Sequence, residues 1–440
     1  MSAHQGPLGQ NLIYLEPDGG RLAIRGGRVF PATGSVTLAP ATVVVEGERI
    51  TAVGRDRDVP IPDGCRVIDA RGKFVMPGLI DLHVHFTGVF TSDPYRRFLQ
   101  PPFAARVIRA ALDASEVLAA GFTTVRELGH GSMDQVIGLR HAINHRLIAG
   151  PRILTSGWAI SQTGGHGDPN VFPREWTRQL RPRSTFADGA DECRRVVREN
   201  FGAGADLVKI YATERGLGPG PDGLRAVPNF TIPEIEAMTD EAHRRGAKVA
   251  AHATSPEGIR NAILGGVDTI EHGGDIGAHD DLLDLMVERG VFLVPTLSVY
   301  YWIASEGAAV KTESRAISGS RAMMDVQARY LAKVHRHGVR IALGTDTGNI
   351  RGRGENAREL EMMVEYGLSP LDALLAGTRV GAEAMGLQDH LGTLEAGKLG
   401  DMLILAADPL QDIACVRRKE NIVHIIKSRA SLSRAPKAPA

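Results

Sequence analysis

The spacing of apolar and polar residues divides the chain into two β-rich ends and a longer middle. Stretches such as ATVVVEGERITAVG, within residues 22–77, are typical of short strands joined by Gly-containing turns, in the spacing of antiparallel β structure. LGTLEAGKLGDMLILAADPL and NIVHIIKSRASL, near the other end, repeat this pattern. We therefore predict one small β-sandwich domain built from both termini, residues 1–77 and 391–440.

The middle, residues 78–390, alternates short apolar runs with helical stretches such as HDDLLDLMVERG. The eight runs are LIDLHVHF, FTTVREL, RILTSGWAI, ADLVKIYAT, KVAAHAT, VDTIEHG, VFLVPTLSV and VRIALGTD. Thr231, Ser255 and Ser369 stand where helix-capping hydroxyls are expected. Eight β-then-α repeats over roughly three hundred residues are what a (β/α)8 barrel requires. The predicted fold class is α/β, a TIM barrel, and a doubly wound open sheet is the alternative.

Composition and charge narrow the function classes. The 51 basic residues equal the 51 acidic ones, which removes the electrostatic reason to expect nucleic-acid or anionic-membrane binding. No run of eighteen apolar residues occurs, so we expect no membrane span. The opening MSAHQGPLGQ lacks a signal-peptide pattern, and the three cysteines form no CxxC. We expect a cytoplasmic protein that acts on a small molecule.

The first apolar run of the middle contains two histidines separated by one residue, His83 and His85. Alternate residues of a strand face the same side, so the two imidazoles point together and can hold one metal ion. Two surface histidines in a turn are the alternative. A second such pair, His335 and His337, lies in a basic stretch before VRIALG, and we interpret it as a solvated helix end.

Four further polar residues lie within other apolar runs or at their ends. Lys209 interrupts VKIY, and a buried lysine without a partner is costly. His252 lies in KVAAHAT, His272 ends VDTIEH, and Asp346 in IALGTDTG shares a face with small residues that leave space beside its carboxylate. Singly, each could be a satisfied core polar group. Together with His83 they lie at the carboxyl ends of predicted strands, where barrel active sites are found.

These motifs resemble those of the amidohydrolase superfamily. GLIDLHVHF, VKIYAT, AAHAT, TIEHGG and LGTDTG occur in the family's order, together with SQTGGHGD, GENARELEMMVEYGLSPLDAL and LGTLEAGKLGDM. The resemblance spans nearly the whole chain. It is greatest to the imidazolonepropionase-like and prolidase-like group, which includes Xaa-Pro dipeptidases and ochratoxin-hydrolysing amidases.

The resemblance implies a centre of two divalent metal ions. Its ligands would be His83, His85, Lys209, His252, His272 and Asp346. The first two histidines and Asp346 would hold the more buried ion, and Lys209 would bridge both ions as a carboxylated side chain. Such ligands suit zinc best, with manganese and cobalt as alternatives. Asp346 would also act catalytically, accepting the proton of the attacking hydroxide and passing it to the leaving amine.

Four residues are candidates for substrate contacts. His166, in SQTGGHGD, resembles the family's histidine that contacts the substrate carbonyl, and a loop histidine that fixes a Gly-rich turn is the alternative. Tyr211 could bind a substrate carboxylate or pack in the barrel interior. Thr254 and Arg353 stand where relatives often carry other residues, so they bear on specificity.

The predicted function is binuclear metal-dependent hydrolysis of an amide, in a dipeptide or an N-acyl amino acid. A mycotoxin or xenobiotic amide or carbamate, as in ochratoxin A, and a cyclic amide are the alternative substrates. Lys209 argues against a mononuclear deaminase, and the filled ligand positions argue against an inactive scaffold. Relatives often form homo-oligomers, and we expect the same here.

Overall fold

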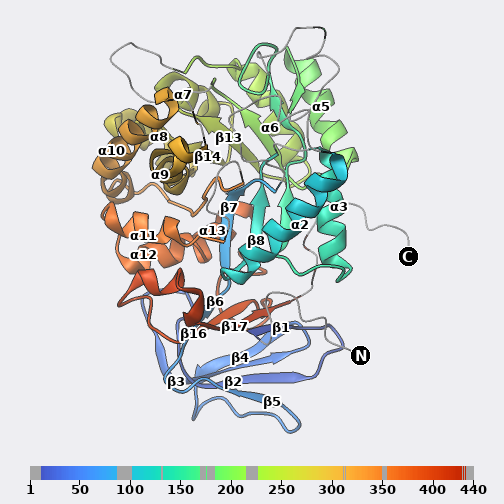
Figure 1. Ribbon diagram of the computed structural model, residues 1–440, viewed down its shortest axis with the longest axis vertical. Coiled ribbons are helices and arrows are strands. Elements are labelled where there is room, and N and C mark those ends of the chain that lie inside the picture. Colours follow the sequence, from blue (N-terminus) through green and yellow to red (C-terminus); the bar gives the residue numbers. More distant parts are fainter. Residues whose placement is uncertain are drawn as a thin grey trace.

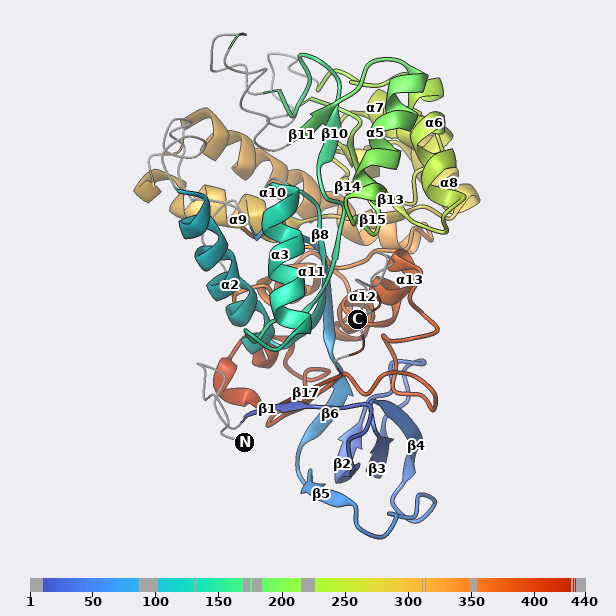
Figure 2. The ribbon, with the colours of Figure 1, turned by 90° about the vertical axis from the view of Figure 1, so that its right-hand side faces the viewer.

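The molecule has two regions, a mixed β-sheet and a larger part in which helices surround parallel strands (Figure 1). The view turned by 90° shows the same separation (Figure 2). The structure is a computed structural model. It describes residues 11–86, 102–129, 132–168, 175, 184–214, 226–310, 312, 314–348, 354–428, 430 and 432.

Strands from both ends of the chain share the mixed sheet. Their order is β1-β17-β16-β6-β2-β3-β4, and β5 pairs with β2. The strands are β1 (Leu12–Tyr14), β2 (Arg21–Val29), β3 (Leu38–Glu46), β4 (Arg49–Arg55), β5 (Arg66–Asp69), β6 (Phe74–Pro77), β16 (Met402–Leu405) and β17 (Ile422–Lys427).

This topology corrects two details of the prediction. The strands form one continuous sheet rather than the two sheets of a sandwich. The sheet is also mixed, because β1 pairs with β17, and β2 with β5 and β6, in parallel. Apolar side chains from distant strands, including Ile24, Val43 and Ile426, belong to one buried cluster.

The other region contains two parallel sheets, with strand orders β7-β8-β9 and β11-β10-β12-β13-β14-β15. The strands are β7 (Leu79–Val84), β8 (Phe122–Glu127), β9 (Arg152–Thr155), β10 (Ala159–Ser161), β11 (Ser184–Phe186), β12 (Val208–Tyr211), β13 (Val249–Ala253), β14 (Thr269–His272) and β15 (Phe292–Val294). Every residue of β12, β13 and β14 is buried, as expected for parallel strands covered on both faces.

Three of the eight predicted strands differ in detail. RILTSGWAI is divided between β9 and β10. VFLVPTLSV is a strand only over Phe292–Val294, because a helix begins at Leu297. The last run, VRIALGTD, forms isolated bridges instead of a regular strand. Residues 341–347 nevertheless lie between β15 and β7, since Ala342 N–H donates to Leu293 O and Leu82 N–H donates to Leu343 O, both at 2.9 Å.

The helices of this region pack their apolar faces against the strands in one large buried cluster. They are α2 (Phe103–Ala119), α3 (Met133–Asn144), α5 (Ala190–Gly202), α6 (Ile232–His243), α7 (Pro256–Leu264), α8 (Asp280–Arg289), α9 (Leu297–Glu306), α10 (Ser314–Arg336), α11 (Arg358–Glu365), α12 (Pro370–Ala376) and α13 (Arg379–Met385). The predicted caps are confirmed: Thr231 forms a capping box before α6, and Ser255 and Ser369 cap α7 and α12. Across the described ranges, no helix has the length and apolarity needed to cross a membrane.

Candidate metal centre

Three of the six predicted ligands form a compact group. His83 on β7 and His85, just beyond its end, are almost completely buried. Nε2 of His85 is 2.9 Å from Oδ1 of Asp346, and Nε2 of His83 is 3.7 Å from the same oxygen. One potential ligand atom from each residue lies within 4.8 Å of the other two. This group can hold a single metal ion.

The sequence analysis assumed that strand alternation would turn Asp346 toward the other ligands. Its backbone conformation does so instead. Its φ of 53° is in the left-handed region, which is uncommon for residues other than glycine. The glycines beside it allow close packing. A Cβ atom on Gly344 would lie 3.0 Å from Cβ of His83, and one on Gly348 would lie 1.6 Å from the carbonyl oxygen of His85. The glycines of LGTDTG therefore let this segment pack directly against the two histidines.

His252 and His272 extend the group across β13 and β14. The ring centroid of His272 is 5.1 Å from that of His83 and 4.6 Å from that of His252. Neighbouring residues of a strand face opposite sides, so Glu271 and His272 would not both face His83 in a regular strand. The φ of His272, 71°, departs from strand geometry, and as a result both side chains lie next to His83.

The buried histidines are held in their neutral form. Burial lowers the pKa of His83, His252 and His272 well below its usual value, and the positive charge of Lys209 lowers each one further. Neutral imidazole is the form that binds metal ions.

Lys209, on β12, is only 2% exposed. Its Nζ has no hydrogen-bond partner among the described residues, and the same holds for Nε2 of His252. Burial lowers the pKa of Lys209 to about 8. Buried polar atoms without partners are costly in a folded protein. The unpartnered Nε2 of His252 therefore fits a metal ligand, and the unpartnered Nζ of Lys209 fits the carboxylated side chain that the family resemblance implies.

The Nδ1 atoms of three histidines are engaged, which leaves each Nε2 to face the centre. His83 Nδ1 is 2.8 Å from Oε2 of Glu271, and His85 Nδ1 is 2.9 Å from the carbonyl oxygen of Gly129. His272 Nδ1 is 2.7 Å from the hydroxyl of Thr296. Such partners fix the tautomer and the ring orientation of metal-binding histidines.

Glu271 is itself held by Arg126, and sequence reasoning missed both residues. Nη2 of Arg126 donates to Oε1 of Glu271 at 2.6 Å, and its Nε donates to the carbonyl oxygen of Leu82 at 2.7 Å. Both side chains are buried on interior strands. A charged residue within the apolar runs FTTVREL and TIEHGG was the signal that could have revealed them.

The four candidate substrate residues have different surroundings. The ring of His166 stacks on Tyr211, with centroids 4.2 Å apart and an angle of 9°, and its centroid is also 4.2 Å from that of His252. His166 and Tyr211 therefore border the metal centre. Thr254 is hydrogen-bonded through its hydroxyl to Thr213 at 3.2 Å. Arg353 lies outside the described residues.

Tyr300, on α9, is a further residue near the centre. Its ring centroid is 6.5 Å from that of His272. Burial raises the pKa of its hydroxyl, and the negative charge of Asp346 raises it further. The sequence analysis missed this residue because it predicted a strand over VFLVPTLSV and did not expect a helix to begin at Leu297.

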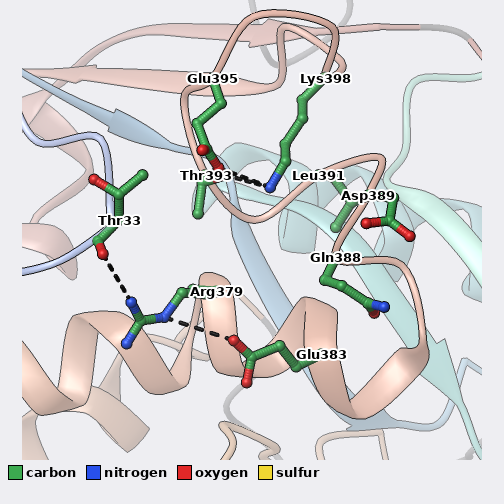
Figure 3. A pocket seen from close by; sticks show the side chains of 9 residues that line it. All are labelled: Thr33, Arg379, Glu383, Gln388, Asp389, Leu391, Thr393, Glu395 and Lys398. Carbon is green, nitrogen blue, oxygen red and sulfur yellow. Dashed lines mark hydrogen bonds and ion pairs between the residues drawn. The ribbon is translucent and has the colours of Figure 1, made fainter.

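Two other features lie apart from the centre. His337 pairs with Asp284 at 2.7 Å and His335 lies 3.8 Å from Asp372, both at the end of α10. The cavity in Figure 3, of about 280 Å³, contains none of the predicted site residues. It lies beside α13 and is lined by Thr33, Arg379, Glu383, Gln388, Asp389, Leu391, Thr393, Glu395 and Lys398.

Comparisons with known proteins agree on one family of hydrolases. Residues 74–428 match the model of the amidohydrolase family. Ochratoxinase from Aspergillus niger is 32% identical over 438 residues, covering 94% of this chain and 88% of the relative. Its crystal structure aligns with a TM-score of 0.81 over 93% of this chain and 94% of that chain, at 29% identity. A Xaa-Pro dipeptidase structure with methionine bound in its active site aligns with a TM-score of 0.79, at 30% identity over 92% and 97% of the two chains.

Proposed function

The chain belongs to the amidohydrolase family and is a hydrolase of C–N amide bonds, and we propose that it cleaves dipeptides or N-acyl amino acids at a centre of two metal ions. The six ligands would be His83, His85, Lys209, His252, His272 and Asp346. Zn²⁺ suits this donor set best. Membership of this family implies a TIM-barrel-like α/β fold for the parallel-strand region.

The observation that carries this proposal is the environment of Lys209. Its Nζ is buried near three neutral histidines and has no hydrogen-bond partner among the residues that the structure describes. Burial favours the neutral amine, and a neutral amine can add to CO2 with loss of one proton. The resulting carbamate has two oxygens and a negative charge, which suit divalent ions.

Two ions, when bound, supply a nucleophilic hydroxide at neutral pH and polarise the scissile carbonyl. The residues of this chain perform the remaining steps. Asp346, whose carboxylate faces the histidine cluster, accepts the proton of the attacking hydroxide and passes it to the leaving nitrogen. His166 binds the carbonyl oxygen of the substrate, and Tyr211, stacked on it, binds the substrate carboxylate.

One similar protein supports a substrate that releases an amino acid, because it is a Xaa-Pro dipeptidase whose active site holds methionine. Ochratoxinase, another similar protein, is the reason to keep mycotoxin amides as alternative substrates. We also propose that the strands close into a (β/α)8 barrel over residues 78–390, with residues 1–77 and 391–440 forming the second domain. The hydrogen bonds of residues 341–347 to β15 and β7 support this closure.

A metal analysis followed by a substrate screen tests the proposal. We expect about two equivalents of Zn²⁺ per chain. We expect hydrolysis of dipeptides or N-acyl amino acids in a panel that also contains aryl amides, carbamates and cyclic amides. One equivalent or none would contradict the binuclear centre. Activity confined to carbamates or cyclic amides would contradict the substrate class and leave the metal centre intact.

A further inference from the structure

A buried carboxyl group, that of Glu359 on α11, holds the first turn of α9 beside the metal centre. Its Oε1 accepts a hydrogen bond from Leu297 N–H and its Oε2 accepts one from Ser298 N–H, both at 2.7 Å. The side chain is completely buried. The first N–H groups of a helix lack partners within the helix. Glu359 therefore caps α9 from a separate helix.

Capping from outside leaves the residue before α9, Thr296, available for another contact. The side chain of Thr296 makes no capping bond to its own helix. Its hydroxyl lies instead 2.7 Å from Nδ1 of His272. Thr296 has φ 50° and ψ 50°, a left-handed conformation that is costly for a β-branched residue and persists only where surrounding contacts enforce it.

The same turn also contacts the segment that carries Asp346. The hydroxyl of Ser298 donates to the carbonyl oxygen of Thr345 at 3.2 Å. Thr345 directly precedes Asp346 in the chain. Glu359 thus fixes a turn that is bonded both to His272 and to the backbone next to Asp346.

We propose that Glu359 is a positioning residue of the metal centre. By fixing the first turn of α9, it holds Thr296 in its left-handed conformation, and Thr296 in turn orients the ring of His272. This inference rests on the proposed function, because it takes His272 as a metal ligand.

The test uses Glu359→Gln, with Glu361→Gln as the matched control. Glutamine can accept only one of the two N–H bonds, and its NH2 group would face the other donor. Glu361 lies on the same helix, is buried, and pairs instead with Arg358 and Arg417 at 2.7 Å. Metal-free protein is titrated with Co²⁺ and followed by visible absorption, and its melting temperature is recorded without metal.

We expect Glu359→Gln to weaken binding of one Co²⁺ equivalent by about 10- to 100-fold and to change the absorption spectrum, as loss of an orienting partner typically does. Glu361→Gln should bind Co²⁺ as the wild type does. Unchanged Co²⁺ affinity and spectrum in Glu359→Gln, with only a lower melting temperature, would overturn the inference. Wild-type protein that takes up no Co²⁺ would instead contradict the proposed function itself, and the inference with it.

A double-mutant cycle tests the route through Thr296. Thr296→Val removes the hydroxyl and keeps the shape of the side chain, so it should cause a similar loss of Co²⁺ affinity. The double variant should lose little more than the weaker-binding single variant, because both substitutions break one chain of contacts. Losses that multiply across the two sites would show independent effects and overturn the proposed route.

Discussion

Lys209 and Lys427 are both buried lysines, and they differ in what surrounds them. Burial lowers the pKa of each to about 8. Each Nζ lies about 6 Å from a tyrosine ring centroid, Lys427 from Tyr14 at 5.9 Å and Lys209 from Tyr211 at 6.0 Å. Nζ of Lys427 also donates to the carbonyl oxygen of Ser428 at 3.2 Å. Nζ of Lys209 has no hydrogen-bond partner in the described part of the chain. The two lysines belong to polar clusters at opposite ends of the parallel strands.

The cluster around Lys427, here called the strand-start cluster, joins the two regions of the molecule. Its members are Thr124, Arg152, Asp401, Lys427 and Ser428. Arg152 donates to Asp401 at 2.5 Å, to the hydroxyl of Ser428 at 2.7 Å and to the hydroxyl of Thr124 at 2.8 Å. Asp401 also accepts a hydrogen bond from Ser428 N–H at 2.7 Å. These groups satisfy one another, so the cluster needs no ligand.

In the candidate metal centre, by contrast, not all buried polar atoms have hydrogen-bond partners within the described ranges. The centre also places three residues, His272, Thr296 and Asp346, at positive φ. Unsatisfied polar atoms and strained backbone lower the stability of the native state and are retained at functional sites. The comparison indicates that one cluster stabilises the fold, whereas the other has the features of a site built to bind a ligand.

The largest effect is expected from Lys209→Ala. The variant should lose detectable activity and tight binding of both ions, because the carbamate bridges them in the proposed centre. Lys427→Met should retain full metal content and turnover. Metal analysis and hydrolysis assays on the two variants check this. An active Lys209→Ala enzyme with full metal content would remove the distinction between the two lysines.

Asp346→Asn separates proton transfer from metal binding. Asparagine keeps the size and one oxygen but loses the basicity of the carboxylate. We therefore expect much of the metal to remain, while turnover falls by about 10²- to 10⁴-fold. Turnover and metal content are measured on the same preparation. Near-normal turnover would exclude Asp346 as the group that transfers the proton.

Arg152→Met tests the strand-start cluster. The substitution leaves Asp401 buried without its cation, so the free energy of unfolding should fall by about 3–5 kcal/mol. Urea denaturation measures this loss, and metal content per folded molecule should stay at the wild-type level. A variant as stable as the wild type, but poor in metal, would reverse the roles assigned to the two clusters.

A smaller effect concerns pH. The folded pKa of each lysine is about 8, below the ordinary value of 10.5. Between these two pH values the unfolded chain binds more protons than the folded chain, so the free energy of unfolding should rise with pH. Each lysine contributes up to about 1.4 kcal/mol per pH unit. In metal-free protein depleted of CO2, Lys209→Met and Lys427→Met should each remove about one lysine's share of this slope. A slope unchanged in either variant would contradict the assigned burial effect.

The sequence predicted the interior strands and most candidate ligands for one physical reason. Buried parallel strands are nearly continuous apolar runs, so a polar residue such as Lys209 or His252 stands out within them. The ordered turns at helix starts were also predicted, since a capping residue acts on its immediate neighbours.

The parts that sequence reasoning missed depend on contacts between distant segments. Glu359 and Thr296 act through a helix start that the apolar run VFLVPTLSV concealed. The left-handed conformations of His272 and Asp346 break the alternation on which the prediction relied. Parallel pairing of β2 with β5 and β6 could not be predicted either, because strand direction is set by the path of the chain and not by local pattern.

Direct detection of the carbamate tests the central claim most closely. Metal-free protein is reconstituted with Zn²⁺ and ¹³C-labelled bicarbonate and examined by ¹³C NMR, with Lys209→Ala and Lys427→Met treated in parallel. The account predicts one protein-bound carbamate signal in the wild type and in Lys427→Met, and none in Lys209→Ala. Absence of the signal from active wild-type enzyme, or its persistence in Lys209→Ala, would contradict the account.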